Sequence, residues 1–285
     1  MPEAAEVKLN VDFLNKSFGT NRILKASINS GRFLKQFPKN WTKLSTELFF
    51  LETAEFRNIR SKGKYIYGKI IVGGKLYWFT STLGMSGFWT NKDIKHNHLS
   101  FHTQNGEIIS FNDARCFGNF NIETDSKVID DKIGALGIDF FKDEDVINQF
   151  LSDKIQKRLK KLQNKQICEV LLNQSICAGV GNYIKCEALY RTKTHPATLL
   201  RNIPDFHLGH ILSTCQRIIH DSYKVGGASF KSFKDESGQM SGEYSKKFQV
   251  YGKQKDPYGY DIIKRTFNDG RTTHFVPKVQ QIQYI

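Results

Sequence analysis

The sequence lacks long apolar runs. No stretch approaches the ~18 consecutive apolar residues that a membrane-spanning helix needs. The first residues include Glu3 and Glu6 and lack the basic start and apolar stretch of a secretory signal peptide. We therefore expect a soluble protein that is neither bound to a membrane nor secreted.

Paired cysteines are also missing. The chain has five cysteines, an odd number, and no C-x-x-C pair, which argues against a disulfide framework. Reduced thiols in an intracellular compartment fit this pattern better. We expect the cysteines to be small core residues; they are Cys116, Cys168, Cys177, Cys186 and Cys215.

Acidic residues are few compared with basic ones. Asp and Glu number 28 against 42 Lys and Arg, so the net charge is +14 and the isoelectric point lies near 9.5. Such a positive field gathers polyanions, and nucleic acid is the first partner to test. A basic surface kept only for solubility explains the charge equally well.

The composition is otherwise that of a folded protein. Hydrophobic residues make up 39% of the 285 residues, which include 22 glycines, and this excludes collagen-like, low-complexity and unfolded chains. We find no internal repeat. The length predicts roughly two domains at about 150 residues each.

The first half of the chain predicts one helix followed by strands. Apolar residues at helical spacing predict a helix over residues 4–18, with Pro2 suited to its first turn. Strand-like runs then flank Gly73-Gly74 and Asn105-Gly106, which are strong hairpin signals. We expect a β-sandwich over residues 49–120.

The second half is mostly helical. Basic residues surround an apolar stripe near residues 154–165, and further helices are predicted over 182–192 and 206–225. Residues 228–247 are rich in Ser, Gly and charge and predict a mobile loop. Runs at 262–267 and 271–276 predict a terminal hairpin around Asn268-Asp269-Gly270.

The start of the chain can carry covalent chemistry. Removal of Met1 leaves Pro2 as a secondary amine, which can attack an aldehyde carbon and form an iminium cation that accepts electrons. Glu3 beside it can supply general acid/base catalysis. A Pro-Glu pair that only initiates the helix is the simpler interpretation of these two residues.

Three basic or amide residues are suited to phosphate contacts. Lys64 enters a strand, Asn182 follows a G-x-G turn at a helix start, and Arg271 lies at the hairpin tip. Each taken alone fits an ordinary surface or connecting residue.

Three other residues carry no specific signal when each is taken alone, and core packing is the default interpretation for Met85 and Phe117. Met85 lies in a Gly-Met-Ser-Gly turn, and Arg115 and Phe117 lie in Asp-Ala-Arg-Cys-Phe-Gly.

Histidines 96, 98 and 102 share one strand face by parity, and we expect a solvated face there rather than a metal site.

Taken in order, these motifs resemble those of the Fpg/Nei family of DNA glycosylases over nearly the whole chain. The matching motifs are Met-Pro-Glu, Lys-Gly-Lys-Tyr, Leu-Gly-Met-Ser-Gly, Asp-x-Arg-x-Phe-Gly, Asn-Gln leading to Gly-Val-Gly-Asn-Tyr, and Gln-Val-Tyr-Gly. Several motifs in sequence are far more specific than any one of them.

The resemblance implies a role for each matching residue. Pro2 attacks the sugar C1′ and expels the damaged base, while Glu3 donates a proton to the opening sugar. Lys64 grips phosphate and assists β-elimination, and Arg271 assists δ-elimination. Asn182 binds phosphate, and a last group fills the gap left by the flipped nucleotide; it consists of Met85, Arg115 and Phe117.

The resemblance also implies a finger without zinc. The family's four cysteine ligands correspond here to Tyr258, Asp261, Val276 and Val279, as in the zincless finger of plant members and vertebrate Nei-like enzymes. Other departures are Ala4-Ala5 after the glutamate, Cys116 in place of a second arginine, and Thr82 in place of a histidine.

We therefore predict an α+β protein in three parts. Residues 1–137 form the N-terminal helix and catalytic β-sandwich, 138–247 a helix-two-turn-helix DNA-binding domain with the mobile loop 228–247, and 248–285 the zincless β-hairpin finger.

The implied function is a bifunctional glycosylase and abasic-site lyase that acts on duplex DNA. We expect a monomer that works without cofactor or metal, inside the cell with access to DNA, and favours oxidised pyrimidines and hydantoins. A noncatalytic binder of damaged or bent duplex is the alternative, although it needs neither Pro2 nor Glu3. An RNA-binding module is disfavoured because the sequence shows no aromatic RNA platform.

Overall fold

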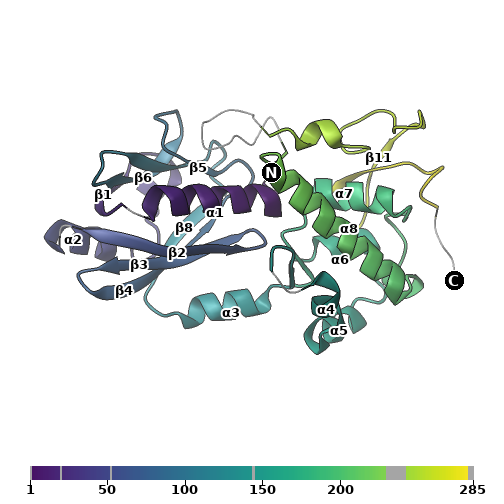
Figure 1. The fold of residues 1–285 in the computed structure, drawn as a ribbon, viewed down its shortest axis with the longest axis horizontal. Coiled ribbons are helices and arrows are strands. Elements are labelled where there is room, and N and C mark those ends of the chain that lie inside the picture. Colours follow the sequence, from purple (N-terminus) through teal and green to yellow (C-terminus); the bar gives the residue numbers. More distant parts are fainter. Residues whose placement is uncertain (1, 20, 52, 143–144, 229–241, 282–285) are drawn as a thin grey trace. The chain divides into compact units, whose positions relative to one another are not determined.

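The computed structural model describes residues 2–19, 21–51, 53–142, 145–228 and 242–281. Its helices (Figure 1) are α1 (Ala4–Phe18), α2 (Trp41–Leu51), α3 (Lys127–Ala135), α4 (Val146–Leu151), α5 (Asp153–Lys160), α6 (Ile167–Leu172), α7 (Asn182–Arg191) and α8 (Asp205–Lys224). Short 3-10 helices are η1 (Gly31–Leu34), η2 (Leu200–Asn202) and η3 (Tyr244–Lys247).

The longer strands belong to the first half of the chain. They are β1 (Ile23–Ile28), β2 (Ala54–Lys62), β3 (Tyr65–Val72), β4 (Lys75–Thr82), β5 (Phe88–Thr90), β6 (Asn97–Thr103), β7 (Ile108–Asn112) and β8 (Asn119–Glu123). The later strands are β9 (Ile138–Asp139), β10 (Cys177–Ala178), β11 (Ile263–Thr266) and β12 (Thr272–Phe275).

The chain divides into two compact units. One contains Met1–Gly134 and Gly226–Glu243, and the other contains Ala135–Val225 and Tyr244–Ile285. Most of the predicted mobile loop, residues 229–241, lies outside the described residues. The division into three functional parts stays a prediction.

The first unit is built on an antiparallel sheet. Its strands among the described residues follow the order β5-β7-β6-β1-β2-β3-β4-β8. The two predicted hairpins are confirmed: β3 and β4 pair across Gly73-Gly74, and β6 and β7 pair across Asn105-Gly106. Gly73, Gly74 and Gly106 all have positive φ, which is why glycine suits these turns.

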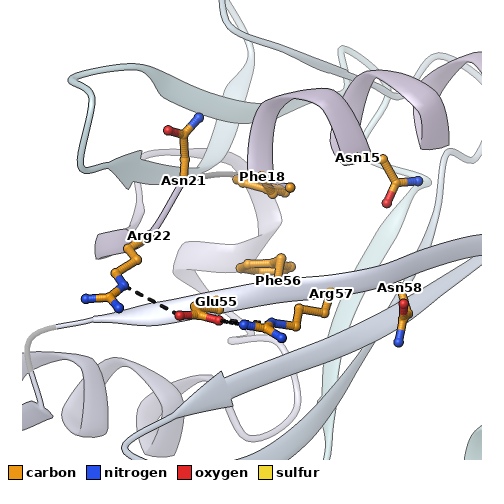
Figure 2. Close-up of a pocket in the computed structure, with 9 residues that line it drawn as sticks. Asn15, Phe18, Asn21, Arg22, Glu55, Phe56, Arg57 and Asn58 are labelled. Atoms are coloured by element: carbon orange, nitrogen blue, oxygen red, sulfur yellow. Dashed lines mark hydrogen bonds and ion pairs between the residues drawn. The ribbon is translucent and has the colours of Figure 1, made fainter.

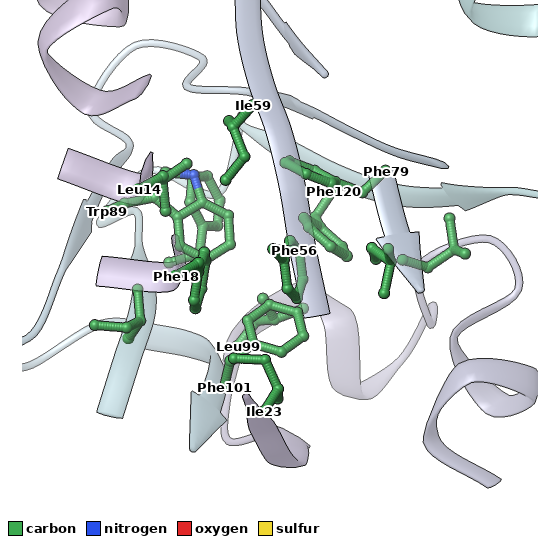
Figure 3. Packing of buried hydrophobic residues seen from close by; sticks show 14 of the residues in the cluster. Leu14, Phe18, Ile23, Phe56, Ile59, Phe79, Trp89, Leu99, Phe101 and Phe120 are labelled. Atoms are coloured by element: carbon green, nitrogen blue, oxygen red, sulfur yellow. The ribbon is translucent and has the colours of Figure 1, made fainter. Parts of the chain in front are cut away.

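Aromatic side chains fill the core of this unit (Figure 3). Phe101 is fully buried and its ring lies 5.0 Å from that of Phe56 and 5.6 Å from that of Phe120. Trp89 on β5 lies 5.8 Å from Phe120 on β8, so side chains from the two edge strands meet. The sheet therefore curls around one core, as expected for a β-sandwich.

Helix α1 has the bounds that its spacing predicts. Its apolar positions face the core, with Val11 and Phe18 each 2% exposed. The expectation that Pro2 lies in the first turn is wrong. Glu3 is the N-cap, because its carboxylate can accept the backbone N–H of Glu6, and Pro2 therefore precedes the helix.

The second unit is mainly helical. The predicted basic helix corresponds to α5, where Ile155 and Leu159 are buried while the lysines lie outside. The predicted helices at 182–192 and 206–225 correspond to α7 and α8. The terminal hairpin β11–β12 matches its prediction to within one residue at each strand end.

The cysteines are all reduced, and all but the half-buried Cys116 lie in the interior, as expected. None of the helices in the described ranges is both long and apolar enough to cross a membrane.

We expect Phe101→Ala to destabilise the first unit by about 3–5 kcal/mol, because it removes a fully buried ring from an aromatic cluster. Urea unfolding followed by tryptophan fluorescence measures this loss, since Trp41 and Trp89 contact the same ring. Phe117→Ala is the matched control, because that ring is 57% exposed and should change stability by less than about 0.5 kcal/mol. Equal losses in the two variants would contradict the assignment of this core.

Candidate functional site

The beginning of α1 is held by two buried glutamates. Glu3 is 2% exposed, and its backbone N–H donates to Glu6 Oε2 at 2.8 Å. In return, the Glu3 carboxylate accepts the Glu6 backbone N–H. This reciprocal cap fixes the backbone next to Pro2, which is itself buried.

Glu6 also ties the helix to a distant segment. Its second oxygen, Oε1, accepts the Ala228 N–H at 2.8 Å. Gly227 has a positive φ, and a Cβ there would lie 3.1 Å from Glu6. Glu6 is not among the site residues predicted from the sequence, although its three-residue spacing from Glu3 is the signature of a capping box.

Lys64 lies in the tight turn between β2 and β3. Gly63-Lys64 forms this two-residue turn, and Gly63 has a φ of 57°. The turn lies at the end of the sheet where α1 begins (Figure 1). Helix α1 runs along β2, and Asn15 Nδ2 donates to the Ile59 carbonyl at 2.9 Å. The half-buried Lys64 ammonium is thus carried on a rigid hairpin.

The turns that carry Met85 and Arg115 are joined by a buried carboxylate. Asp113 is fully buried, and its Oδ1 accepts the Ser86 hydroxyl at 2.5 Å and the Arg115 N–H at 3.2 Å. Its Oδ2 accepts the Gly118 N–H at 2.7 Å. Ser86 and Asp113 are not among the site residues predicted from the sequence, although they lie beside Met85 and Arg115.

The same two turns touch each other directly. A Cβ on Gly84 would lie 2.5 Å from the Gly118 nitrogen, so only glycine permits this approach. The Arg115 guanidinium lies over the Phe117 ring, 5.1 Å from its centre. Phe117 is 57% exposed, so core packing is the wrong interpretation for it. The structure therefore brings Met85, Arg115 and Phe117 together, with an exposed ring and cation that can stack on bases.

The expectation of a solvated histidine face is wrong for His98. This side chain is 4% exposed, and its ring nitrogens lie 2.8 Å from the Asp113 carbonyl and 2.8 Å from Ser30 Oγ. Cys116 Sγ lies 3.3 Å from the same ring. Across the part of the chain that the structure describes, no group of three His, Cys, Asp or Glu side chains is arranged to hold a metal ion.

In the second unit, Asn182 is the first residue of α7. The loop before it is fixed by Gln174, whose Oε1 accepts the Gly179 N–H at 2.9 Å and whose Nε2 donates to the Val180 carbonyl at 3.0 Å. Gly179 has a φ of 94°. The loop thus places Asn182 at the N-terminus of α7, where the helix dipole favours the binding of an anion.

Arg271 lies at the tip of the β11–β12 hairpin, close in space to Asn182. The Asn182 amide Nδ2 donates to the Thr272 carbonyl at 2.8 Å, next to Arg271. Arg271 is exposed, and its backbone N–H donates to Asp269 Oδ1 at 3.0 Å. Two cationic or amide groups from distant parts of the sequence are thereby placed on one surface of this unit.

The finger is framed by polar contacts to α7. Glu187 is fully buried, and its carboxylate accepts backbone N–H groups from Gln249, Val250 and Tyr251 at 2.9 to 3.0 Å. Tyr190 donates its hydroxyl to Asp256 at 2.9 Å. Burial, and then the Asp256 carboxylate, raise the pKa of Tyr190.

The positions that correspond to zinc ligands do not fit a zinc site. Val276 is fully buried and Val279 packs against the same apolar cluster, and neither side chain offers a ligand atom. Tyr258 is 79% exposed, and Asp261 pairs with Lys255 at 2.9 Å.

A polar pocket of about 490 Å³ lies near the C-terminal end of α1 (Figure 2). Arg22 and Arg57 both contact Glu55 there, and the hydrogen bond from Arg57 is the main cause that lowers the pKa of Glu55. Phe18 and Phe56 stack beside it, with ring centres 4.5 Å apart. None of the site residues expected from the sequence lines this pocket.

Comparisons with known proteins give two matching family models. Residues 1–120 match the formamidopyrimidine-DNA glycosylase N-terminal domain, and residues 142–234 match the H2TH domain of the same proteins. A formamidopyrimidine-DNA glycosylase of Novosphingobium aromaticivorans is 28% identical over 99% of this chain and 100% of its own length.

Solved structures with DNA have the same fold. MutM in complex with DNA that contains carbocyclic 8-oxo-G gives a TM-score of 0.79 at 26% identity, over 98% of this chain and 100% of that one. The wild-type Lactococcus lactis Fpg with DNA that contains an oxidised pyrimidine gives 0.77 at 25% identity over the same shares.

The finger should lose stability in mild acid. Burial is the main cause that lowers the pKa of His274, whose Nδ1 accepts the Gly252 N–H at 2.7 Å. An unfolded histidine titrates near 6.5, so the unfolded state binds the proton first as the pH falls. The neutral His274 therefore makes its full contribution to the free energy of unfolding above pH ~6.5. This contribution falls as the pH drops below this value, until the folded imidazole is protonated as well.

Urea unfolding between pH 5.5 and 7.5 and NMR titration of the His274 ring measure this effect. His274→Gln is expected to reduce the pH dependence. It should not abolish it, because burial also lowers the pKa of His102, His195 and His207. An NMR midpoint for His274 at or above 6.5 would contradict the prediction.

Proposed function

We propose that this chain, which belongs to the formamidopyrimidine-DNA glycosylase family, removes oxidised bases from duplex DNA and then cleaves the strand at the abasic site. The observation that carries the proposal is the N-terminal motif. Pro2 directly precedes the buried Glu3, and Glu6 fixes the backbone of both through the cap.

The proposed chemistry begins once Met1 is removed. The Pro2 nitrogen forms a bond to the sugar C1′ and the bond between C1′ and the damaged base breaks; the base leaves with the electron pair and takes up the proton that the Pro2 nitrogen loses. Glu3 donates a proton to the ring oxygen as the sugar opens, which leaves an iminium cation on Pro2. This cation withdraws electrons, so a proton leaves C2′ and the 3′ phosphate departs by β-elimination.

Residues outside the first turn of α1 hold the DNA. We assign phosphate contacts to Lys64 and Asn182, and assistance of the later δ-elimination to Arg271. Met85, Arg115 and Phe117 fill the gap left when the damaged nucleotide leaves the stack. The close approach of their two turns through Asp113 supports this last assignment.

We further propose that the finger is of the zincless type and that oxidised pyrimidines and hydantoins are preferred substrates. The apolar packing of Val276 and Val279 supports the first point. The second rests on resemblance to Nei-like enzymes, and a panel of duplexes with one defined lesion each decides it. The proposed enzyme is a monomer that works inside the cell without a cofactor.

Borohydride should trap the protein covalently on DNA that contains an abasic site, because it reduces the iminium formed by Pro2. An N-terminal extension that blocks residue 2 should abolish trapping. Undiminished trapping by the extended protein would exclude Pro2 as the nucleophile. Absence of trapping by the protein without the extension would favour the noncatalytic alternative.

On duplex DNA that contains an oxidised base, Glu3→Gln should keep DNA binding and slow base excision by about 10²- to 10⁴-fold, since the general acid is lost. Glu107→Gln is the matched control, because this carboxylate lies in the β6–β7 turn away from the N-terminus, and it should leave excision unchanged. If excision survives in Glu3→Gln, the acid lies elsewhere.

Strong chelators should change neither the folding nor the activity of the protein, because the finger is held by packing and hydrogen bonds. Thermal unfolding and excision are measured before and after dialysis against chelator, together with the metal content. One zinc per chain, lost together with activity, would contradict the zincless assignment.

A further inference from the structure

Lys185 on α7 is a buried cation that the proposed chemistry does not use. It is fully buried, and its Nζ donates to the Asp269 carboxylate and, at 2.8 Å, to Thr273 Oγ1. The Asp269 side chain is 1% exposed. We call these three residues the Lys185 clamp.

A buried ion pair is a poor source of stability. Removing both charges from water is costly, and well-packed apolar residues of similar volume often stabilise a fold as well or better. Apolar packing already holds other parts of this finger, through Val276 and its neighbours. The clamp therefore points to a geometric role at the hairpin tip.

The clamp holds the backbone on both sides of Arg271. Asp269 lies two residues before it and Thr273 two residues after it, and both are bound to the same ammonium group. The other carboxylate oxygen of Asp269 accepts the Arg271 N–H at 3.0 Å. One carboxylate thus connects the rigid helix α7 to the backbone of Arg271.

A second contact from α7 acts on the same strand. Asn182 lies three residues before Lys185, on the same face of the helix, and its Nδ2 donates to the Thr272 carbonyl. Helix α7 therefore fixes residues 269, 272 and 273, while the Arg271 side chain stays exposed. Gly270, with a φ of 68°, permits the turn between them.

A second ion pair between described residues of the finger has no such arrangement. Lys255 and Asp261 are 2.9 Å apart, but their side chains are 61% and 85% exposed. Exposed pairs of this kind contribute little. This pair supplies a matched control in the same finger.

We propose that Lys185 and Asp269 are positioning residues that hold Arg271 in place to grip a DNA phosphate and to assist δ-elimination. This inference rests on the function proposed above for Arg271. A guanidinium grips phosphate in a fixed fork geometry, so a displaced tip loses the contact although the arginine remains.

The test compares variants of the full chain on DNA with an abasic site. They are Asp269→Asn, Lys185→Met, the pair of both changes, Arg271→Ala alone and with Asp269→Asn, and the control Lys255→Met/Asp261→Asn. The ratio of δ- to β-elimination products is measured, together with the dependence of DNA binding on salt. Borohydride trapping reports the Pro2 reaction separately.

We expect Asp269→Asn and Lys185→Met to lower the product ratio by about tenfold, because a small misplacement of a reacting group is costly. The slope of log K against log salt should become shallower by about 0.9, the value of one phosphate contact. The control pair should match the wild type in both measurements.

Two further measurements distinguish a displaced Arg271 from a general loss of stability of the fold. With both changes, Lys185→Met/Asp269→Asn, the melting temperature should recover because neither charge remains unpaired, while the product ratio stays low. In the Arg271→Ala background, Asp269→Asn should lower the ratio no further. Additive losses, or a ratio restored together with the melting temperature, would overturn the inference.

The proposed function can fail separately. Absence of trapping by the wild type would exclude the Pro2 mechanism, and the salt slope on undamaged duplex would then test the clamp alone. A slope for Asp269→Asn equal to that of the wild type would overturn the clamp in either case.

Discussion

Buried carboxylates that accept backbone N–H groups hold several loops of the proposed site. Glu6 fixes the start of α1, Asp113 joins the turns of Met85 and Arg115, and Glu187 frames the finger. In a dry interior such bonds are strong, and leaving either partner unpaired is costly. These loops consequently have few alternative conformations, although acidic residues are the scarcer charge in the chain.

Two kinds of contact stabilise the finger: apolar packing and hydrogen bonds from α7. Apolar packing around Val250 and Val276 stabilises the finger, but this contribution depends little on the orientation of the packed groups. Hydrogen bonds from α7 to Thr272 and Thr273 fix the orientation of strand β12, because hydrogen bonds depend on angle as well as distance. In the proposed zincless finger, a combination of both kinds of contact does what metal ligation does in other fingers.

Local patterns predicted about half of the helices and strands among the described residues. The bounds of α1 and β3 follow directly from apolar spacing and from Gly73-Gly74, because both signals act over a few residues. Local signals do not show how the sheet closes into the expected β-sandwich. Trp89 and Phe120 lie far apart in the sequence and meet only after the sheet curls. Pro2 lies two residues before the first helical residue, Ala4, because the N-cap at Glu3 depends on the Glu6 side chain.

The sequence by itself determined part of the elements, the positive charge and the order of motifs that points to Pro2, Glu3, Asn182 and Arg271. Only the tertiary structure decided what supports them. Lys185 and Asp269 are 84 residues apart, and Glu6 and Ala228 are 222 apart. No periodicity links such distant positions. Their pairing arises from burial, because a buried polar group that lacks a hydrogen-bond partner is costly.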